Sequence, residues 1–135
     1  MANDKIPNVG FHHLAISCKD LDKSIEFYKA IGFTPVASWG EGTGRAAMLD
    51  IGNGGIFELF ANGSDAPQSN EKMPHFAFST TCADTCYENA MAAGAVSQMV
   101  PTDVDIPATP ALKVRIAFVR GLDGEVLEFF QMRND

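Results

Sequence analysis

Apolar and polar positions alternate in a short run near the start of the chain, and this run leads into a helical pattern. His13 opens the apolar run, and apolar residues at helical spacing follow over 21–28. Asp20 or Asp22 is a plausible N-cap for this helix, and Gly32 is expected to end it.

The same pattern returns in the second half of the chain. His75 opens the apolar run 76–79, a second helix is expected over 83–93, and Gly94 closes it. Each closing glycine stands 19 residues after its histidine. The two halves therefore read as an internal repeat.

Three short strand candidates follow each helix, and glycine-bearing segments separate several of them. They are 34–38, 45–51 and 55–61 in the first half, and 96–100, 113–119 and 125–131 in the second. We expect one domain over 1–135, with module 1 at about 9–62, a polar linker at about 63–73 and module 2 at about 74–132.

This order predicts an α+β protein built from two βαβββ modules. One helix covers only one face of a four-stranded sheet, so each module leaves a second face to be lined. Two such modules can form a half-open mixed β barrel with the helices outside and a shared cavity.

Alternation along the first strand of each module assigns the histidines to faces. Phe76 and Phe78 are bulky and are expected against the second helix, which places His75 on the opposite face. The same reasoning turns His13 away from the first helix. His12 then falls on the helix side or at its rim, where a structural role is expected.

The last strand of each module carries a glutamate among apolar residues. Glu58 and Glu128 are both in this position, and an ionised carboxylate buried without a partner costs several kcal/mol. A positive group must therefore lie nearby. Arg45, Lys113 or Arg115 could supply it, and the histidines would then be ordinary core residues.

The alternative is a divalent metal ion, because imidazoles and carboxylates at equivalent positions of a repeat form a mixed nitrogen and oxygen ligand set. Such a set accepts nickel, cobalt, zinc, manganese or iron. The proposed ligands are His13, Glu58, His75 and Glu128.

Composition narrows the class of partner. The formal net charge is -7 and the pI is about 4.8, which argues against nucleic acid and against an anionic membrane surface. The first residues lack a basic start followed by an apolar stretch, and three cysteines are too few for a disulfide framework. We expect a soluble cytoplasmic protein with reduced thiols.

The sequence resembles the vicinal oxygen chelate superfamily. The resemblance rests on HLAISCKDLDKSIEFY and IGF in module 1, and on IAFV and DGEVLEFF in module 2. Within that superfamily the His, Glu, His, Glu set is similar to bacterial glyoxalase I. The resemblance implies a homodimer in which His13 and Glu58 of one chain meet His75 and Glu128 of the other.

The resemblance also implies an activity. A glyoxalase I-like lyase or isomerase would move a proton on a 2-oxoaldehyde-thiol adduct through a metal-bound enediolate, with Glu128, and Glu58 opposite, as catalytic carboxylates. The alternatives are a metal-dependent epimerase of an acyl-CoA or similar acid, and a non-enzymatic small-molecule binding protein of the drug-resistance type. The pattern disfavours an extradiol dioxygenase, since Glu58 would occupy a site needed for oxygen.

Substrate contacts are less well defined by the sequence. The resemblance implies glutathione as a possible co-substrate, but only one of two glutathione-binding positions agrees with the family pattern. Asn62 is the expected asparagine, whereas Ser17 stands where an arginine is expected. Alternation over 113–119 is expected to send Lys113 and Arg115 toward the cavity, where Arg115 would grip the carboxylate or phosphate of an anionic substrate. Otherwise Arg115 would pair with Glu58 or a surface acid.

Two further features leave alternatives open. The segment 101–110 contains three prolines, so it cannot be a central strand throughout and is either a lid or an edge loop. Trp39 and Phe60 would line the pocket or belong to the core.

Overall fold

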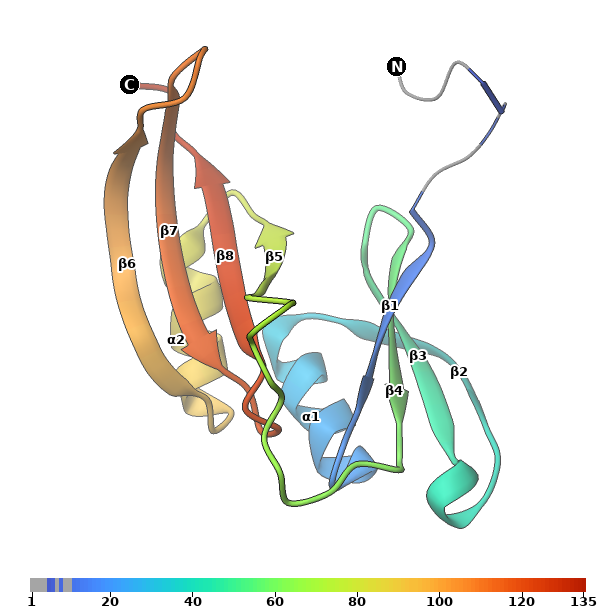
Figure 1. The fold of residues 1–135 in the computed structure, drawn as a ribbon. Coiled ribbons are helices and arrows are strands. Elements are labelled where there is room, and N and C mark those ends of the chain that lie inside the picture. The colour runs from blue at the N-terminus through green and yellow to red at the C-terminus, as the bar shows by residue number, and fades with distance from the viewer. Residues whose placement is uncertain (1–4, 7, 9–10) are drawn as a thin grey trace.

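The computed structural model describes residues 5, 6, 8 and 11–135, and the expected start of module 1 near residue 9 lies outside them. Two βαβββ modules follow one another along the chain (Figure 1). The first contains β1 (His13–Ser17), α1 (Leu21–Ile31), β2 (Thr34–Trp39), the short 3₁₀ helix η1 (Gly42–Gly44), β3 (Ala46–Gly52) and β4 (Gly55–Phe60). The second contains β5 (Phe76–Ser79), α2 (Ala83–Ala92), β6 (Val96–Ile106), β7 (Leu112–Arg120) and β8 (Val126–Met132).

Each module folds into one mixed four-stranded sheet. The strand orders are β1-β4-β3-β2 and β5-β8-β7-β6, so corresponding strands occupy corresponding places. The first strand of each module runs parallel to the last, and the remaining neighbours are antiparallel. The predicted α+β class and the two βαβββ modules are confirmed.

The helices begin and end close to the residues that the sequence indicates. The Asp20 side chain accepts a hydrogen bond from the Lys23 backbone N–H at 3.1 Å, so Asp20 is the N-cap of α1. Gly32 ends α1 with φ of 117°, a left-handed conformation that suits glycine. In the second module α2 ends at Ala92, and Gly94 follows with φ of 108°.

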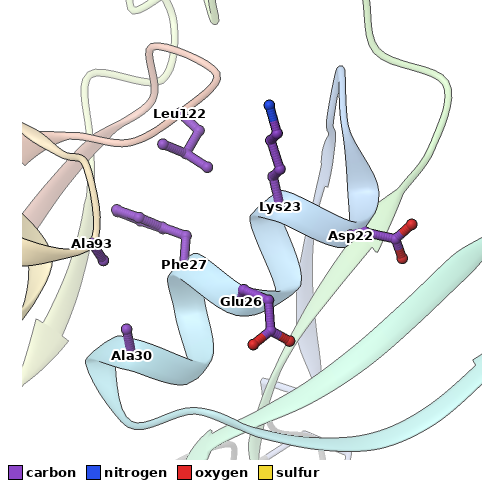
Figure 2. Close-up of a pocket in the computed structure, with 7 residues that line it drawn as sticks. All are labelled: Asp22, Lys23, Glu26, Phe27, Ala30, Ala93 and Leu122. Atoms are coloured by element: carbon purple, nitrogen blue, oxygen red, sulfur yellow. The ribbon is translucent and has the colours of Figure 1, made fainter.

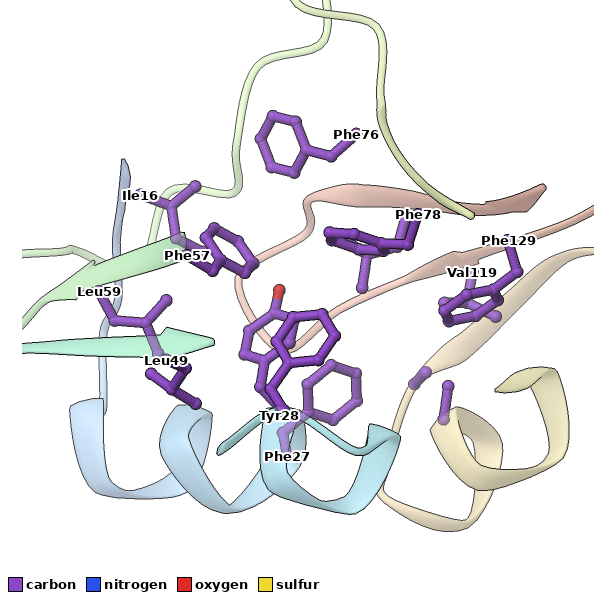
Figure 3. Packing of buried hydrophobic residues seen from close by; sticks show 14 of the residues in the cluster. Ile16, Phe27, Tyr28, Leu49, Phe57, Leu59, Phe76, Phe78, Val119 and Phe129 are labelled. Atoms are coloured by element: carbon purple, nitrogen blue, oxygen red, sulfur yellow. The ribbon is translucent and has the colours of Figure 1, made fainter. Parts of the chain in front are cut away.

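Each sheet turns one face toward a single core that the two modules share, and we call this the helix face of the sheet. Phe57 of β4 and Phe78 of β5 lie in this core with Tyr28 of α1, so both modules contribute to it (Figure 3). The opposite face carries His13 in the first sheet and His75 in the second, and we call it the histidine face.

A buried polar cluster joins the two modules beside this core. The Tyr28 hydroxyl donates a hydrogen bond to the Glu125 carboxylate, which is 1% exposed. Asp123, two residues earlier, accepts hydrogen bonds from the Lys19 backbone N–H at 2.8 Å and from the Ser24 hydroxyl at 3.3 Å. The loop before β8 is therefore fixed to α1.

The prediction for 101–110 needs correction. The strand expected to stop at residue 100 continues to Ile106, and β6 pairs with β7 as the edge strand of the second sheet. Pro101 is tolerated because the register shifts between Met99 and Thr102. The part up to Ile106 is an edge strand, neither a lid nor a loop. Among the described residues, no helix is long and apolar enough to cross a membrane.

Candidate metal half-sites

The first sheet holds a histidine against a buried glutamate. Ala15 of β1 pairs with Glu58 of β4 in a parallel register, so His13, two residues earlier, shares the face of Glu58. The Nε2 atom of His13 lies 3.3 Å from Oε1 of Glu58. Glu58 is only 7% exposed, whereas the imidazole remains accessible.

The second sheet repeats this arrangement. Ala77 pairs with Glu128, and the Nε2 atom of His75 lies 3.0 Å from Oε1 of Glu128, which is 6% exposed. The Phe118 ring meets the His75 ring edge-on at 5.3 Å between centroids. Burial raises the pKa of the Glu128 carboxyl above its ordinary value, and the neighbouring His75 partly offsets this.

Arginine and lysine do not neutralise the two glutamates. In the part of the chain that the structure describes, the ion-pair partners of Glu58 and Glu128 are the two histidines. Arg45 instead pairs with Asp22 of α1 at 2.9 Å. The alternative in which a guanidinium or ammonium group holds these carboxylates is therefore not what the structure shows.

The structure brings the four predicted ligands together as two pairs and not as one cluster. Both sheets use their helix faces for the shared core, so the two histidine faces point away from that core (Figure 1). Over the described residues, no three His, Cys, Asp or Glu side chains gather in a way that could hold a metal. One chain thus presents two separate His–Glu pairs.

The predicted orientation of β7 is wrong. Its register with β8 pairs Phe118 with Glu128, so Phe118 lies on the histidine face and Arg115 lies on the helix face. Arg115 donates two hydrogen bonds to Asp84 of α2, at 2.7 and 2.9 Å, and one to Asp103 at 3.0 Å. The alternative in which Arg115 pairs with a surface acid is the one observed.

Lys113 shares the strand face of Arg115 and likewise does not point toward His75 and Glu128. The prediction for these two residues failed because β7 is apolar on both faces. Ala117 and Val119 pack under the helix, and Ile116 and Phe118 occupy the other side. Alternation alone could not say which apolar set belonged to the core, so the proposed site omits Lys113 and Arg115.

Asn62 and Ser17 meet in one small pocket of about 260 Å³ beside the linker. The Gly63 backbone N–H donates to the Cys18 carbonyl at 3.0 Å and holds the chain there. The two positions that the resemblance links to glutathione are therefore neighbours, although one of them carries a hydroxyl in place of a guanidinium.

Ala46 of β3 pairs with Trp39 of β2 on one side and with Phe60 of β4 on the other, so the three residues lie side by side across the first sheet. Phe60 stands two residues from Glu58 on β4 and so shares its face. Trp39 is 46% exposed, and neither ring belongs to the shared core.

His12 has a contact that the sequence reasoning missed. Its Nδ1 atom lies 2.9 Å from Nδ1 of His13. The two histidines are neighbours in the sequence, and this could have indicated the contact. Alternation instead assigned them to opposite faces of the strand.

A separate hollow lies on the helix side, between α1 and the second module (Figure 2). Phe27 points there toward Ala93 and Leu122, with Lys23 and Glu26 at the rim. Phe27 belongs to the shared core, so this hollow is remote from both histidine faces.

The chain thus consists of two βαβββ modules, and each has a histidine on its first strand and a glutamate on its last. Comparison with known proteins identifies the family that has this fold. Residues 10–129 match the model of the Glyoxalase/Bleomycin resistance protein/Dioxygenase superfamily, and the chain belongs to this family. No curated protein matches the sequence.

Solved structures share the fold at low sequence identity. A glyoxylase/bleomycin resistance protein/dioxygenase domain from Frankia sp. EAN1pec is 20% identical with a TM-score of 0.72, covering 93% of this chain and 98% of that one. A glyoxalase I variant from Zea mays is 22% identical with a TM-score of 0.69, covering 93% of this chain and 45% of that one. TnmS3, an antibiotic binding protein from Streptomyces, is 16% identical with a TM-score of 0.68, covering 95% and 99%.

Proposed function

We propose that the protein is a divalent-metal-dependent lyase or isomerase of the glyoxalase I type, and that two copies pair to build its site. In this proposal His13 and Glu58 of one chain meet His75 and Glu128 of the other. The observation that carries the proposal is the pair of matching half-sites, each a buried carboxylate with an imidazole as its ion-pair partner.

The residues fit a divalent ion. Two imidazoles and two carboxylates are a common donor set for such ions, and the two negative charges would balance the charge of the metal. Each glutamate is nearly buried, which makes an unbalanced negative charge costly and favours a cation nearby. Four protein donors also leave room for the oxygen atoms of a substrate.

The direction of the two histidine faces supports the pairing of two chains. These faces lie on opposite sides of the shared core, so a single chain cannot close a cavity between them. A two-fold pair would place the first sheet of each copy against the second sheet of the other and would generate two equal sites.

The metal, when bound, would polarise a substrate carbonyl and make the neighbouring C–H bond more acidic. Glu128 would take that proton, because burial raises the pKa of its carboxyl and brings it closer to that of a useful base. Glu58 would return the proton from the opposite side. The apolar surroundings of both carboxylates exclude water and strengthen these interactions.

The experiment is metal analysis of the purified protein followed by an isomerisation assay. Methylglyoxal is offered with glutathione and, separately, with 2-mercaptoethanol, after chelation and with nickel, cobalt, zinc or manganese restored. An acyl thioester epimerisation assay covers the epimerase alternative. The proposal predicts bound metal and metal-dependent turnover, and Glu128→Gln should lower kcat by about 10²-fold or more.

A non-enzymatic small-molecule binding protein is the second candidate. It is favoured by Ser17, which stands where the resemblance expects the glutathione-binding arginine, and by the structural similarity to TnmS3. This candidate predicts no stoichiometric metal and no turnover, so the same metal analysis separates the two.

A further inference from the structure

We infer that Cys82 and Cys86, at the start of α2, form a thiol pair that hydrogen peroxide converts into an intramolecular disulfide. The inference does not depend on the proposed function, because the pair lies apart from the four proposed metal ligands. Cys86 packs against the shared core on the helix side of the second sheet, whereas His75 lies on the opposite face (Figure 1).

Cys82 has the features of a reactive thiol. It is exposed and is the N-cap residue of α2. Its Sγ atom lies 3.1 Å from Oγ1 of Thr85, so the Thr85 hydroxyl can donate a hydrogen bond to a thiolate at Cys82. This hydrogen bond lowers the pKa of the Cys82 thiol below its ordinary value. A position at a helix N-terminus acts in the same direction, so Cys82 is the thiol that reacts first.

Cys86 lies beside it with its thiol in the role of a donor. Its Sγ atom donates a hydrogen bond to Oγ1 of Thr80 at 3.3 Å, and the same oxygen accepts one from the Cys82 backbone N–H at 3.0 Å. One hydroxyl group thus contacts both cysteines. Cys86 is half-buried, so peroxide reaches Cys82 more readily.

The spacing brings the two sulfur atoms near bonding range. Side chains four residues apart are neighbours on a helix, with roughly 5–6 Å between their Cβ atoms, and a disulfide needs about 3.5–4.5 Å. The Cys86 side chain leans toward the start of the helix, where Cys82 lies. Cys82 itself has extended backbone angles, with φ of -150° and ψ of 91°, so it can move without breaking the helix that follows.

The reaction is a balanced two-electron oxidation. The Cys82 thiolate attacks one oxygen of hydrogen peroxide, the O–O bond breaks, and Cys82 becomes a sulfenic acid while the other oxygen leaves as hydroxide and takes up the thiol proton to form water. The Cys86 sulfur then gives up its proton and attacks the Cys82 sulfur. The S–O bond breaks, and the departing hydroxide combines with that proton to form a second water. The two thiols are oxidised to one disulfide, and the peroxide is reduced to water.

Cys18 provides an internal control in the same chain. Its side chain is 0% exposed, and burial raises the pKa of its thiol to about 12. It is therefore neither accessible nor ionised at neutral pH. Peroxide should leave Cys18 reduced under conditions that oxidise the pair.

The test uses the full chain, reduced and treated with a chelator, then exposed to a slight molar excess of hydrogen peroxide. Remaining thiols are alkylated with iodoacetamide in denaturant, and the tryptic peptide 73–113, which contains both cysteines of the pair, is analysed by mass spectrometry. We expect this peptide to be lighter by two hydrogen atoms and to take up no label. Dithiothreitol should restore the uptake of label at both cysteines, and Cys18 should be labelled throughout.

Three variants test the separate roles. Cys86→Ser removes the second thiol, so dimedone should capture Cys82 as a sulfenic acid adduct. Thr85→Val removes the hydroxyl beside Cys82 and should slow oxidation about threefold or more, because less thiolate is present at neutral pH. Thr81→Val is the matched control, an exposed threonine next to Cys82 in the sequence, and should leave the rate unchanged.

Oxidation that stops at a sulfenic or sulfinic acid in the wild type overturns the inference, as does a disulfide that joins two chains in non-reducing electrophoresis. Oxidation of Cys18 as fast as the pair also overturns it, and so do equal rates for Thr85→Val and Thr81→Val. The first three results are read on the wild-type chain, so they decide the matter even where a variant fails to fold. Bound metal and turnover are not measured, so this test and that of the proposed function succeed or fail separately.

Discussion

The Nδ1 atoms of His12 and His13 lie 2.9 Å apart, and the two rings meet at 87°. This contact occupies Nδ1 of His13 and leaves Nε2 of the same ring facing Glu58 at 3.3 Å. His12 therefore orients the imidazole that we propose as a metal ligand. Groups that hydrogen-bond to the second nitrogen of a ligating histidine fix its tautomer and orientation.

Replacing His12 should weaken metal binding. His12→Ala removes the partner of His13 Nδ1 and should lower metal affinity about tenfold, measured by competition with a chelator. His12→Asn keeps an amide oxygen that can accept a hydrogen bond from the same nitrogen, which carries the proton when Nε2 binds a metal, and should recover much of the affinity. If both variants bind metal as tightly as wild type, His12 does not position His13.

Removing the Tyr28 hydroxyl should destabilise the junction between the modules. Tyr28→Phe leaves the buried Glu125 carboxylate without one of its donors and should lower the free energy of unfolding by about 1 to 3 kcal/mol, measured by urea denaturation. Tyr87→Phe is the matched control, since its hydroxyl bonds Ser97 at an exposed site, and should cost less than about 0.5 kcal/mol. Equal losses of unfolding free energy in the two variants would show that the buried hydrogen bond stabilises the protein no more than the exposed one.

The buried Glu125 carboxyl should also make stability depend on pH. Burial raises its pKa above the ordinary 4.5, and the hydrogen bond from Tyr28 only partly offsets this. The stability contributed by such a group is fully present below the ordinary pKa and is lost as pH rises through the raised value. Denaturation at several pH values above 4.5 should show wild type losing stability relative to Glu125→Gln. A constant difference between them would contradict the raised pKa.

Gly63 lies where the chain leaves β4 and passes close to Cys18. A Cβ atom at Gly63 would lie 2.5 Å from the Cys18 carbonyl carbon, so Gly63→Ala must shift the backbone. It should cost about 1 to 3 kcal/mol of unfolding free energy. Gly44→Ala is the matched control, because no atom lies within 4 Å of its added Cβ. A loss no larger than that of the control would show that the close approach at Gly63 relaxes freely.

Alternation was sufficient to place the histidines because β1 and β5 are clearly two-sided. Phe76 and Phe78 are large and buried, whereas Ala77 and Ser79 are small and exposed. The faces of His13 and His75 therefore followed from the sequence. The ends of α1 followed from Asp20 and Gly32 for an equally local reason, the chemistry of helix caps.

The same reasoning failed for β7 because this strand carries apolar residues on both faces. Its orientation depends on which side receives α2, and the ion pair between Arg115 and Asp84 joins residues far apart in sequence. Alternation also assigns a residue to a face without saying what lies opposite that face. For this reason alternation could group the four proposed ligands by type but could not show that one chain presents them as two pairs, an arrangement that only the resemblance implied.

The central claim is that each metal site is shared between two chains, and mixing two defective variants tests it directly. One variant carries His13→Ala with Glu58→Gln, and the other carries His75→Ala with Glu128→Gln. Each alone should bind no metal at this site. After unfolding and refolding of an equal mixture, half of the dimers should contain both variants, and each of these should hold one site with all four native ligands.

The mixture should therefore recover about a quarter of the wild-type metal content, together with a matching share of any metal-dependent turnover. Metal content that stays at the level of the separate variants, although mass spectrometry shows mixed dimers, would contradict a shared site.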